Sequence, residues 1–125
     1  MEKKYLKLND IDAYKRAFHL SNKDWIIILS WDYFSRNTVG TQYVRAIDSV
    51  SANIAEGFGR YSKKDKIKFY RYALGSLKES LAWNVKAKIR NLISFEIYSD
   101  IFNVLNAVPL EINQLIKYTN LTLKK

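Results

Sequence analysis

The sequence predicts an all-α protein, an antiparallel up-down four-helix bundle, and three observations support this fold class. Hydrophobic residues make up 48% of the 125-residue chain, which has only 4 glycines and 1 proline. This composition excludes disorder and favours long regular elements. Apolar side chains recur every three to four positions, the period of a helix. Residues that cap helices lie where such segments start and stop. The length suits one domain over residues 1–125, ordered from about 10 to 120 with frayed ends.

The first helix is predicted to begin at Asn9, whose side chain can cap free backbone N–H groups, with Asp12 near the positive helix end. Taken alone, the apolar run from 26 to 29 fits a strand equally well. No other segment offers a pairing partner, so a helix is favoured. A polar connection is expected from Asp32 to Thr38. The predicted apolar stripe of this helix consists of Ile11, Tyr14, Phe18, Trp25, Ile28 and Leu29.

The second helix is predicted from about Val39 to Phe58 because one of its faces is apolar throughout. Small side chains beside that face would let another helix approach closely. Gly57 and Gly59 are predicted to end the helix, since glycine adopts the left-handed geometry of a C-cap without steric cost. The apolar face is Val39, Tyr43, Ile47, Val50, Ile54 and Phe58, and the small residues are Ala46, Ser49, Ala52 and Ala55.

Ser62 and Asp65 match an N-capping motif, so a third helix is predicted from there to about Asn91. Two non-polar or small-residue stripes run along it, although a single bundle core needs only one. The second stripe packs either on a neighbouring helix of the same chain or on another subunit, and both alternatives stay open. The first stripe is Ile67, Tyr70, Leu74, Leu77, Leu81 and Val85, and the second is Phe69, Ala73, Ser76, Ser80, Trp83 and Ala87.

The fourth helix is predicted from near Ser94 to about Asn120. Pro109 removes one backbone donor and clashes with the preceding turn, so the helix is expected to be kinked or broken there. The tail from 121 to 125 is expected to fray. The apolar side is Ile97, Ile101, Val104, Val108, Ile112 and Leu115, widened by Phe95, Tyr98, Phe102, Leu105 and Ile116.

Positive charge is concentrated in the third helix. Ten basic and two acidic residues lie between Arg60 and Arg90, so this segment carries nearly all of the net charge of +9. A charged helix face is usually the solvated face. Here, however, the acidic residues that normally alternate with basic ones at i,i+4 spacing are almost missing. The residues that fall in one line on a helical wheel are Lys64, Lys68, Arg71, Lys78, Lys86 and Arg90.

We hypothesise that this line binds RNA or DNA, largely independently of base sequence, since a phosphate backbone is the polyanion that fits it. Three tyrosines, at positions 61, 70 and 72, lie near basic positions where a ring can stack on a base. Tyr70 belongs to a core stripe, so Tyr61 in the interhelical turn is the better stacking candidate. The candidate binding residues are Arg60, Lys63, Lys64, Lys68, Arg71, Lys78, Lys86, Arg90 and Tyr61.

Residues for catalysis or metal binding are scarce, so the sequence predicts a non-enzymatic protein with no metal and no cofactor. The chain has no cysteine, which excludes disulfides and Cys-based metal sites, and its one histidine, His19, has no partner for a metal site. Asp48 and Glu56 lie two helical turns apart, too far for paired acid–base work. The segment 57–62 lacks the third glycine of a dinucleotide-binding loop and follows a helix.

The sequence predicts a cytoplasmic protein, because it shows no targeting signal. The N-terminus has basic residues but no apolar stretch of signal-peptide length behind it. The most apolar run, from Trp25 to Trp31, is far shorter than the ~20 residues needed to span a bilayer. The helices are too broadly apolar for an interfacial membrane helix, so no membrane partner is expected.

Three stretches of the chain carry a family resemblance: Asn53-Ile-Ala-Glu-Gly-Phe-Gly-Arg60, Ser62-Lys-Lys64 and Ala73-Leu-Gly-Ser-Leu-Lys-Glu79. The chain resembles the four-helix-bundle proteins encoded in intervening sequences of bacterial 23S rRNA genes. That resemblance implies a ring-like homopentamer. It also implies relatives among accessory proteins of diversity-generating retroelements, which are thought to bind nucleic acid and a reverse transcriptase.

The family motif includes Asn53, Glu56, Gly57, Gly59 and Arg60. The resemblance implies that Asn53, Glu56 and Arg60 hold the second and third helices, or two subunits, together through polar contacts. Alternatively, Glu56 is only a helix-end carboxylate paired with Arg60 at i+4.

Two functions remain in competition. The leading hypothesis is a homo-oligomeric bundle whose basic face binds nucleic acid. The alternative is a protein-interaction scaffold in which the same basic face binds an acidic partner protein and the apolar faces serve only assembly.

Overall fold

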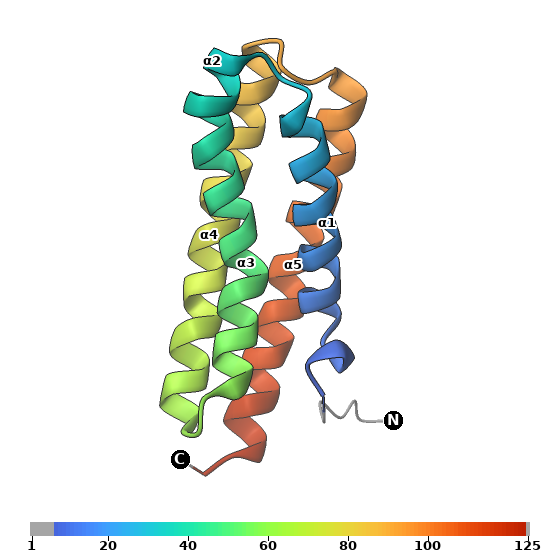
Figure 1. Ribbon diagram of the computed structural model, residues 1–125. Helices are drawn as coiled ribbons and strands as arrows, with labels where there is room; N and C mark the ends of the chain where they lie inside the picture. Colours follow the sequence, from blue (N-terminus) through green and yellow to red (C-terminus); the bar gives the residue numbers. More distant parts are fainter. Residues whose placement is uncertain (1–6, 125) are drawn as a thin grey trace.

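The computed structural model describes residues 7–124, and within this range the chain is all-α with no strand, as predicted. The elements are a 3-10 turn at Leu8–Asp10, α1 at Asp12–Leu29, the short α2 at Tyr33–Ser35, a π-helical turn at Arg36–Gly40, α3 at Thr41–Gly59, α4 at Lys63–Ile89 and α5 at Phe95–Thr122. The long helices α1, α3, α4 and α5 lie side by side (Figure 1).

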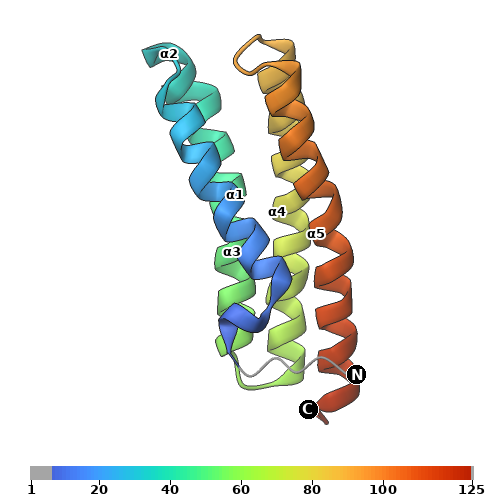
Figure 2. The same ribbon diagram turned by 90° about the vertical axis from the view of Figure 1, so that its right-hand side faces the viewer.

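The four long helices contact one another in the cyclic order α1, α3, α4, α5. Figure 2 shows α1 and α3 on one side and α4 and α5 on the other. The α1–α2 and α4–α5 connections lie at one end of the molecule, and the α3–α4 connection lies at the other, beside the C-terminus (Figure 1). None of the described helices is long and apolar enough to cross a membrane.

Helix α1 differs from its prediction in where it begins. Asn9 lies in the 3-10 turn, and Ile11 precedes the helix without a side-chain cap, so the predicted cap at Asn9 is wrong. The segment from 26 to 29 is helical, which confirms the choice of helix over strand.

The buried face of α1 also differs from the predicted stripe. Phe18, Trp25 and Leu29 are about half exposed, at 46%, 52% and 50%. Ile11 and Ile28 of the predicted stripe are buried, and the rest of the face turned to the core is made of Ala13, Ala17, Leu20, Ser21 and Asp24. Small side chains on this face let α1 pack closely, and a stripe of large apolar residues is left on the outside.

The segment predicted as a polar connection, Asp32 to Thr38, is mostly helical. Asp32 caps α2, because its Oδ2 accepts a hydrogen bond of 3.2 Å from the Ser35 N–H. The predicted core face of α3 is confirmed, with five of its residues buried and Phe58 half-buried. The five are Val39, Tyr43, Ile47, Val50 and Ile54.

The predicted left-handed glycine cap of α3 is wrong. Gly57 and Gly59 both lie within the helix, and no glycine of the described chain has a positive φ. Arg60 ends the helix in an extended conformation with φ −76° and ψ 157°.

The predicted start of α4 is confirmed, since Ser62 Oγ accepts a hydrogen bond of 3.1 Å from the Asp65 N–H. The helix ends at Ile89, and Asn91 has a left-handed φ of 59°. In the second stripe, Ala73, Ser80 and Ala87 are buried within a single chain, because α4 packs between α3 and α5.

Helix α5 is capped by Ser94, whose Oγ accepts from the Ile97 N–H. The helix continues through Pro109, so a break there is wrong, whereas a bend stays a prediction. It also extends to Thr122, past the predicted end at Asn120. The predicted frayed ends fall partly on residues 1–6 and 125, which lie outside the described range.

Candidate functional site

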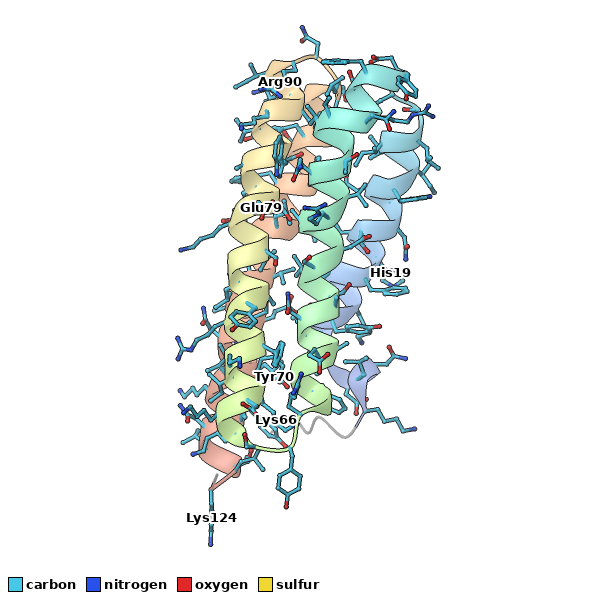
Figure 3. All side chains as sticks on the ribbon, turned by 60° about the vertical axis from the view of Figure 1, so that its left-hand side comes forward. His19, Lys66, Tyr70, Glu79, Arg90 and Lys124 are labelled. Carbon is cyan, nitrogen blue, oxygen red and sulfur yellow. The ribbon has the colours of Figure 1, made fainter. Side chains whose placement is uncertain are left out.

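Six cations on α4 form what we call the basic face: Lys64, Lys68, Arg71, Lys78, Lys86 and Arg90. All six side chains are exposed. Their spacings of three, four, seven or eight residues keep them on one side of the helix. With a rise of 1.5 Å per residue, the row is roughly 39 Å long. In Figure 3, Arg90 and Lys66 mark opposite ends of α4, with Glu79 between them.

The charges of the basic face are not neutralised within the described residues. None of its six cations makes an ion pair there, whereas Lys15, Arg16 and Arg60 each do. Glu79, the acid nearest the middle of the row, instead accepts a hydrogen bond of 3.3 Å from Trp83 Nε1. The face is therefore an open strip of positive potential.

The start of α4 forms one wall of an open groove of about 700 Å³, which we call the basic groove. Asn120 of α5 lies on its other side. The Lys63 Nζ donates a hydrogen bond of 3.3 Å to the Asn120 carbonyl and so joins the two walls. The lining residues are Lys63, Lys64, Ile67, Lys68, Arg71, Tyr72 and Asn120.

The three tyrosines near the basic positions have different environments. Tyr70 is 1% exposed, so it cannot stack on a base from solvent. Tyr61 is 99% exposed and stands free in the α3–α4 connection. Tyr72 is 50% exposed and lines the basic groove. Its ring packs nearly perpendicular to the Phe69 ring, with centroids 5.4 Å apart and planes at 84°.

Arg60 has contacts that set it apart from the basic face. Its Nε lies 2.8 Å from Glu56 Oε2, and its guanidinium carbon lies 4.5 Å from the centroid of Phe69. Lys66 is also used within the fold, since its Nζ donates a hydrogen bond of 2.6 Å to the Phe58 carbonyl at the end of α3. Arg60 therefore has partners within the fold, and so in part does Lys63 through its hydrogen bond to the Asn120 carbonyl. These contacts set the two residues apart from the cations of the basic face.

The motif residues of the α3 end make mostly local contacts. Asn53 Nδ2 donates to the Ser49 carbonyl of its own helix at 2.8 Å. Glu56 and Arg60 form an exposed i,i+4 pair. Two motif residues also contact α4: Arg60 lies over the Phe69 ring, and the Gly57 carbonyl accepts a hydrogen bond of 3.5 Å from Lys66 Nζ. The Gly57 backbone provides the close approach of the two helices.

A buried polar network that is absent from the sequence-predicted site has members on all four long helices, and hydrogen bonds join those of α3, α4 and α5. The Tyr43 hydroxyl of α3 donates a 3.0 Å hydrogen bond to Asn84 Oδ1 of α4. Asn84 Nδ2 donates to the Tyr98 carbonyl of α5 at 3.2 Å. Asp24 of α1 is 1% exposed, and neither of its carboxylate oxygens has a hydrogen bond of good geometry.

The environment of Asp24 shifts its protonation. Burial raises its pKa to about 7, the neighbouring Tyr43 hydroxyl lowers it and the charge of Asp48 raises it. Burial and the proximity of Asp24 also raise the pKa of Tyr43. A helical period places Asp24 on the buried face of α1, because it lies four residues from both Leu20 and Ile28, which are buried. That spacing does not relate Asp24 to Tyr43 and Asn84, which lie on other helices.

Among residues 7–124, no group of three His, Asp or Glu side chains is placed to hold a metal ion. His19 is exposed on the surface of α1, where Figure 3 shows it on the side of the molecule away from the α4 cations.

Comparisons with known proteins identify related chains. The family model of the 23S rRNA-intervening sequence protein matches residues 9–114. A crystal structure of a protein of unknown function from the S23 ribosomal protein family of Bacteroides thetaiotaomicron is similar, with a TM-score of 0.75 and 21% identity. The similarity covers 84% of this chain and 98% of that one, and at this identity it shows a shared fold. No curated protein matches the chain.

Proposed function

The chain belongs to the 23S rRNA-intervening sequence protein family, and we propose that it is a non-enzymatic, antiparallel helical bundle that self-assembles and binds nucleic acid through its basic face. The single observation that carries this proposal is the row of six exposed cations along α4, none of which has a carboxylate partner among residues 7–124.

Phosphate is the ligand that suits such a row. Each phosphate neutralised by a lysine or arginine releases condensed counterions, so affinity falls steeply with salt. Contacts to phosphate carry no base information, and binding is therefore largely independent of sequence. The proposed contacts are made by Lys64, Lys68, Arg71, Lys78, Lys86 and Arg90.

Self-assembly is supported by the apolar surface that α1 leaves exposed. Phe18, Trp25, Ile26 and Leu29 lie on this helix with exposed fractions between 46% and 69%. Large apolar patches on a soluble protein usually mark interaction sites. A closed ring would repeat the basic face around an axis and raise the local positive potential. The resemblance implies five copies and a reverse transcriptase as a possible partner. A cytoplasmic location remains a prediction from the absence of a signal peptide in the sequence.

The test is retention of a labelled oligonucleotide as a function of salt, with Lys64→Ala, Lys68→Ala and Arg71→Ala measured singly. Each variant should weaken binding and lower the slope of log affinity against log salt by about one. Arg45→Ala is the matched control, because Arg45 is an exposed cation on α3, outside the basic face. It should leave the salt slope unchanged.

Absence of salt-sensitive binding at low ionic strength would overturn the nucleic-acid function and leave the acidic-partner scaffold as the better proposal. Size-exclusion chromatography with light scattering, run with and without RNA, tests assembly separately. A mass equal to one 14.7 kDa chain at all concentrations would overturn the oligomer.

A further inference from the structure

The basic face is not uniform along α4, because its cations are densest at the basic groove. Lys63, Lys64, Lys68 and Arg71 lie within nine residues, a rise of roughly 12 Å. The middle of the helix carries Lys78 beside the acidic Glu79, and Gly75 lies between these two regions. The groove is therefore where a polyanion meets the strongest local field.

An aromatic ring is held in the wall of the same groove. Tyr72 packs nearly perpendicular to Phe69, which lies under the Arg60 guanidinium. These contacts fix the Tyr72 ring while half of its surface stays exposed. Tyr61 is exposed to the same solvent but has no such packing, so holding it against a base would cost more conformational entropy.

We infer that the basic groove binds single-stranded nucleic acid, with phosphates on Lys64, Lys68 and Arg71 and one base stacked on Tyr72. This inference rests on the proposed function and specifies its substrate. Cationic grooves with aromatic stacking platforms are the general solution for single strands. A duplex keeps its bases stacked inside, so it presents only phosphates and gains nothing from Tyr72.

The size of the groove agrees with a short segment of one strand. A volume of about 700 Å³ lies within the range of small-ligand sites, roughly 300–1,000 Å³. Phosphates and base faces are common to RNA and DNA, so single strands of both should bind.

The experiment measures fluorescence anisotropy of the full chain with a labelled single strand of about 12 nucleotides, as RNA and as DNA, and with the matching duplex. Tyr72→Leu removes the platform and Tyr72→Phe keeps it. Tyr72→Leu should weaken single-strand binding roughly 5- to 150-fold, and Tyr72→Phe should bind like the wild type. Duplex binding should be the same for all three proteins.

The salt slope separates stacking from charge. Tyr72→Leu should leave the slope unchanged, whereas Lys68→Ala should lower it by about 0.7 for a single strand. Tyr61→Leu is the aromatic control and should bind like the wild type. Thermal unfolding of each variant checks that the fold is retained, and Tyr72→Phe keeps the test decisive if Tyr72→Leu is unstable.

Two outcomes would overturn this inference while the proposed function stands: equal single-strand affinity of the wild type and Tyr72→Leu, or tighter binding of the duplex than of the single strand. Loss of affinity in Tyr72→Phe equal to that in Tyr72→Leu would also overturn stacking. No binding of any oligonucleotide by the wild type would overturn both.

Discussion

Gly57 of α3 lies against the ring of Tyr70 in α4 so closely that a Cβ at position 57 would stand 2.7 Å from Tyr70 Cε1. The same Cβ would lie 2.9 Å from the backbone carbonyl oxygen of Lys66. Gly57 is therefore required by packing between two helices and not by backbone geometry at a helix end.

Gly57→Ala should destabilise the protein by about 1–3 kcal/mol, because Tyr70 is buried and the Lys66 carbonyl belongs to the α4 backbone. Gly59→Ala is the matched control. No atom lies within 4 Å of its added Cβ, and alanine in a helix is favoured over glycine by roughly 0.5–1 kcal/mol. Urea unfolding of both variants measures the difference. Equal stability of the two would contradict the packing role of Gly57.

Sequence periodicity predicts the buried face of α3 correctly but not that of α1. Helix α3 has one continuous apolar face, so its buried residues follow directly from spacing. Helix α1 has large apolar residues on one face and Ala13, Ala17 and Leu20 on another, and both repeat every three to four positions. A prediction from spacing therefore places the larger residues in the core. In the structure the smaller residues face the core, because they let α1 pack closely.

The candidate site was predictable to the extent that it lies on one helix. The basic face follows from the positions of its cations around α4, whereas the basic groove needs Asn120 of α5 beside Lys63. The network of Asp24, Tyr43 and Asn84 draws on three helices, so no spacing within one segment reveals it.

Asp24 should make stability depend on pH. Its pKa is about 7 in the folded protein and close to 3.8 in the unfolded chain, so between these values only the folded state holds the proton. Stability from this group is fully present below the unfolded value and is lost as pH rises from about 4 to about 7. At about 1.4 kcal/mol per pKa unit, the total is at most about 4 kcal/mol.

Asp24→Asn removes this titration and keeps a side chain of similar shape. The free energy of unfolding of the variant should change less between about pH 4 and about pH 7 than that of the wild type. Asp48, whose pKa burial also raises, is present in both proteins and cancels in the comparison. Parallel pH profiles from urea unfolding would show that Asp24 does not titrate in this window.

The charges of the motif pair Glu56 and Arg60 should contribute little to the stability of the protein. The side chains are 50% and 43% exposed, and exposed i,i+4 pairs stabilise a helix by about 0.3–0.5 kcal/mol. Arg60→Ala should cost more than Glu56→Ala, because it also removes the contact with Phe69, by about 0.5–1 kcal/mol. Thermal unfolding at low and high salt measures both. A larger loss for Glu56→Ala, or a smaller oligomer, would instead support the intersubunit role that the resemblance implies.

The exposed apolar side of α1 should be where copies of the chain meet. Trp25, Leu29, Tyr33 and Val44 are exposed or half-buried apolar residues around a groove of about 430 Å³ at the α1–α3 end of the bundle. Arg36 and Asn37 also line this groove. Trp25→Gln keeps a helix-forming residue but removes the large ring, and buried tryptophans at interfaces often contribute 2 kcal/mol or more. Subunit affinity should therefore fall roughly 30-fold.

Light scattering coupled to size exclusion over a range of protein concentrations measures this loss of affinity. Leu110→Gln is the control, since Leu110 is 66% exposed on α5, outside that groove. Because Trp25 is half exposed in the single chain, its replacement should reduce assembly well before it reduces helix content. Unchanged mass for Trp25→Gln together with a reduced mass for Leu110→Gln would move the subunit contact from α1 to α5.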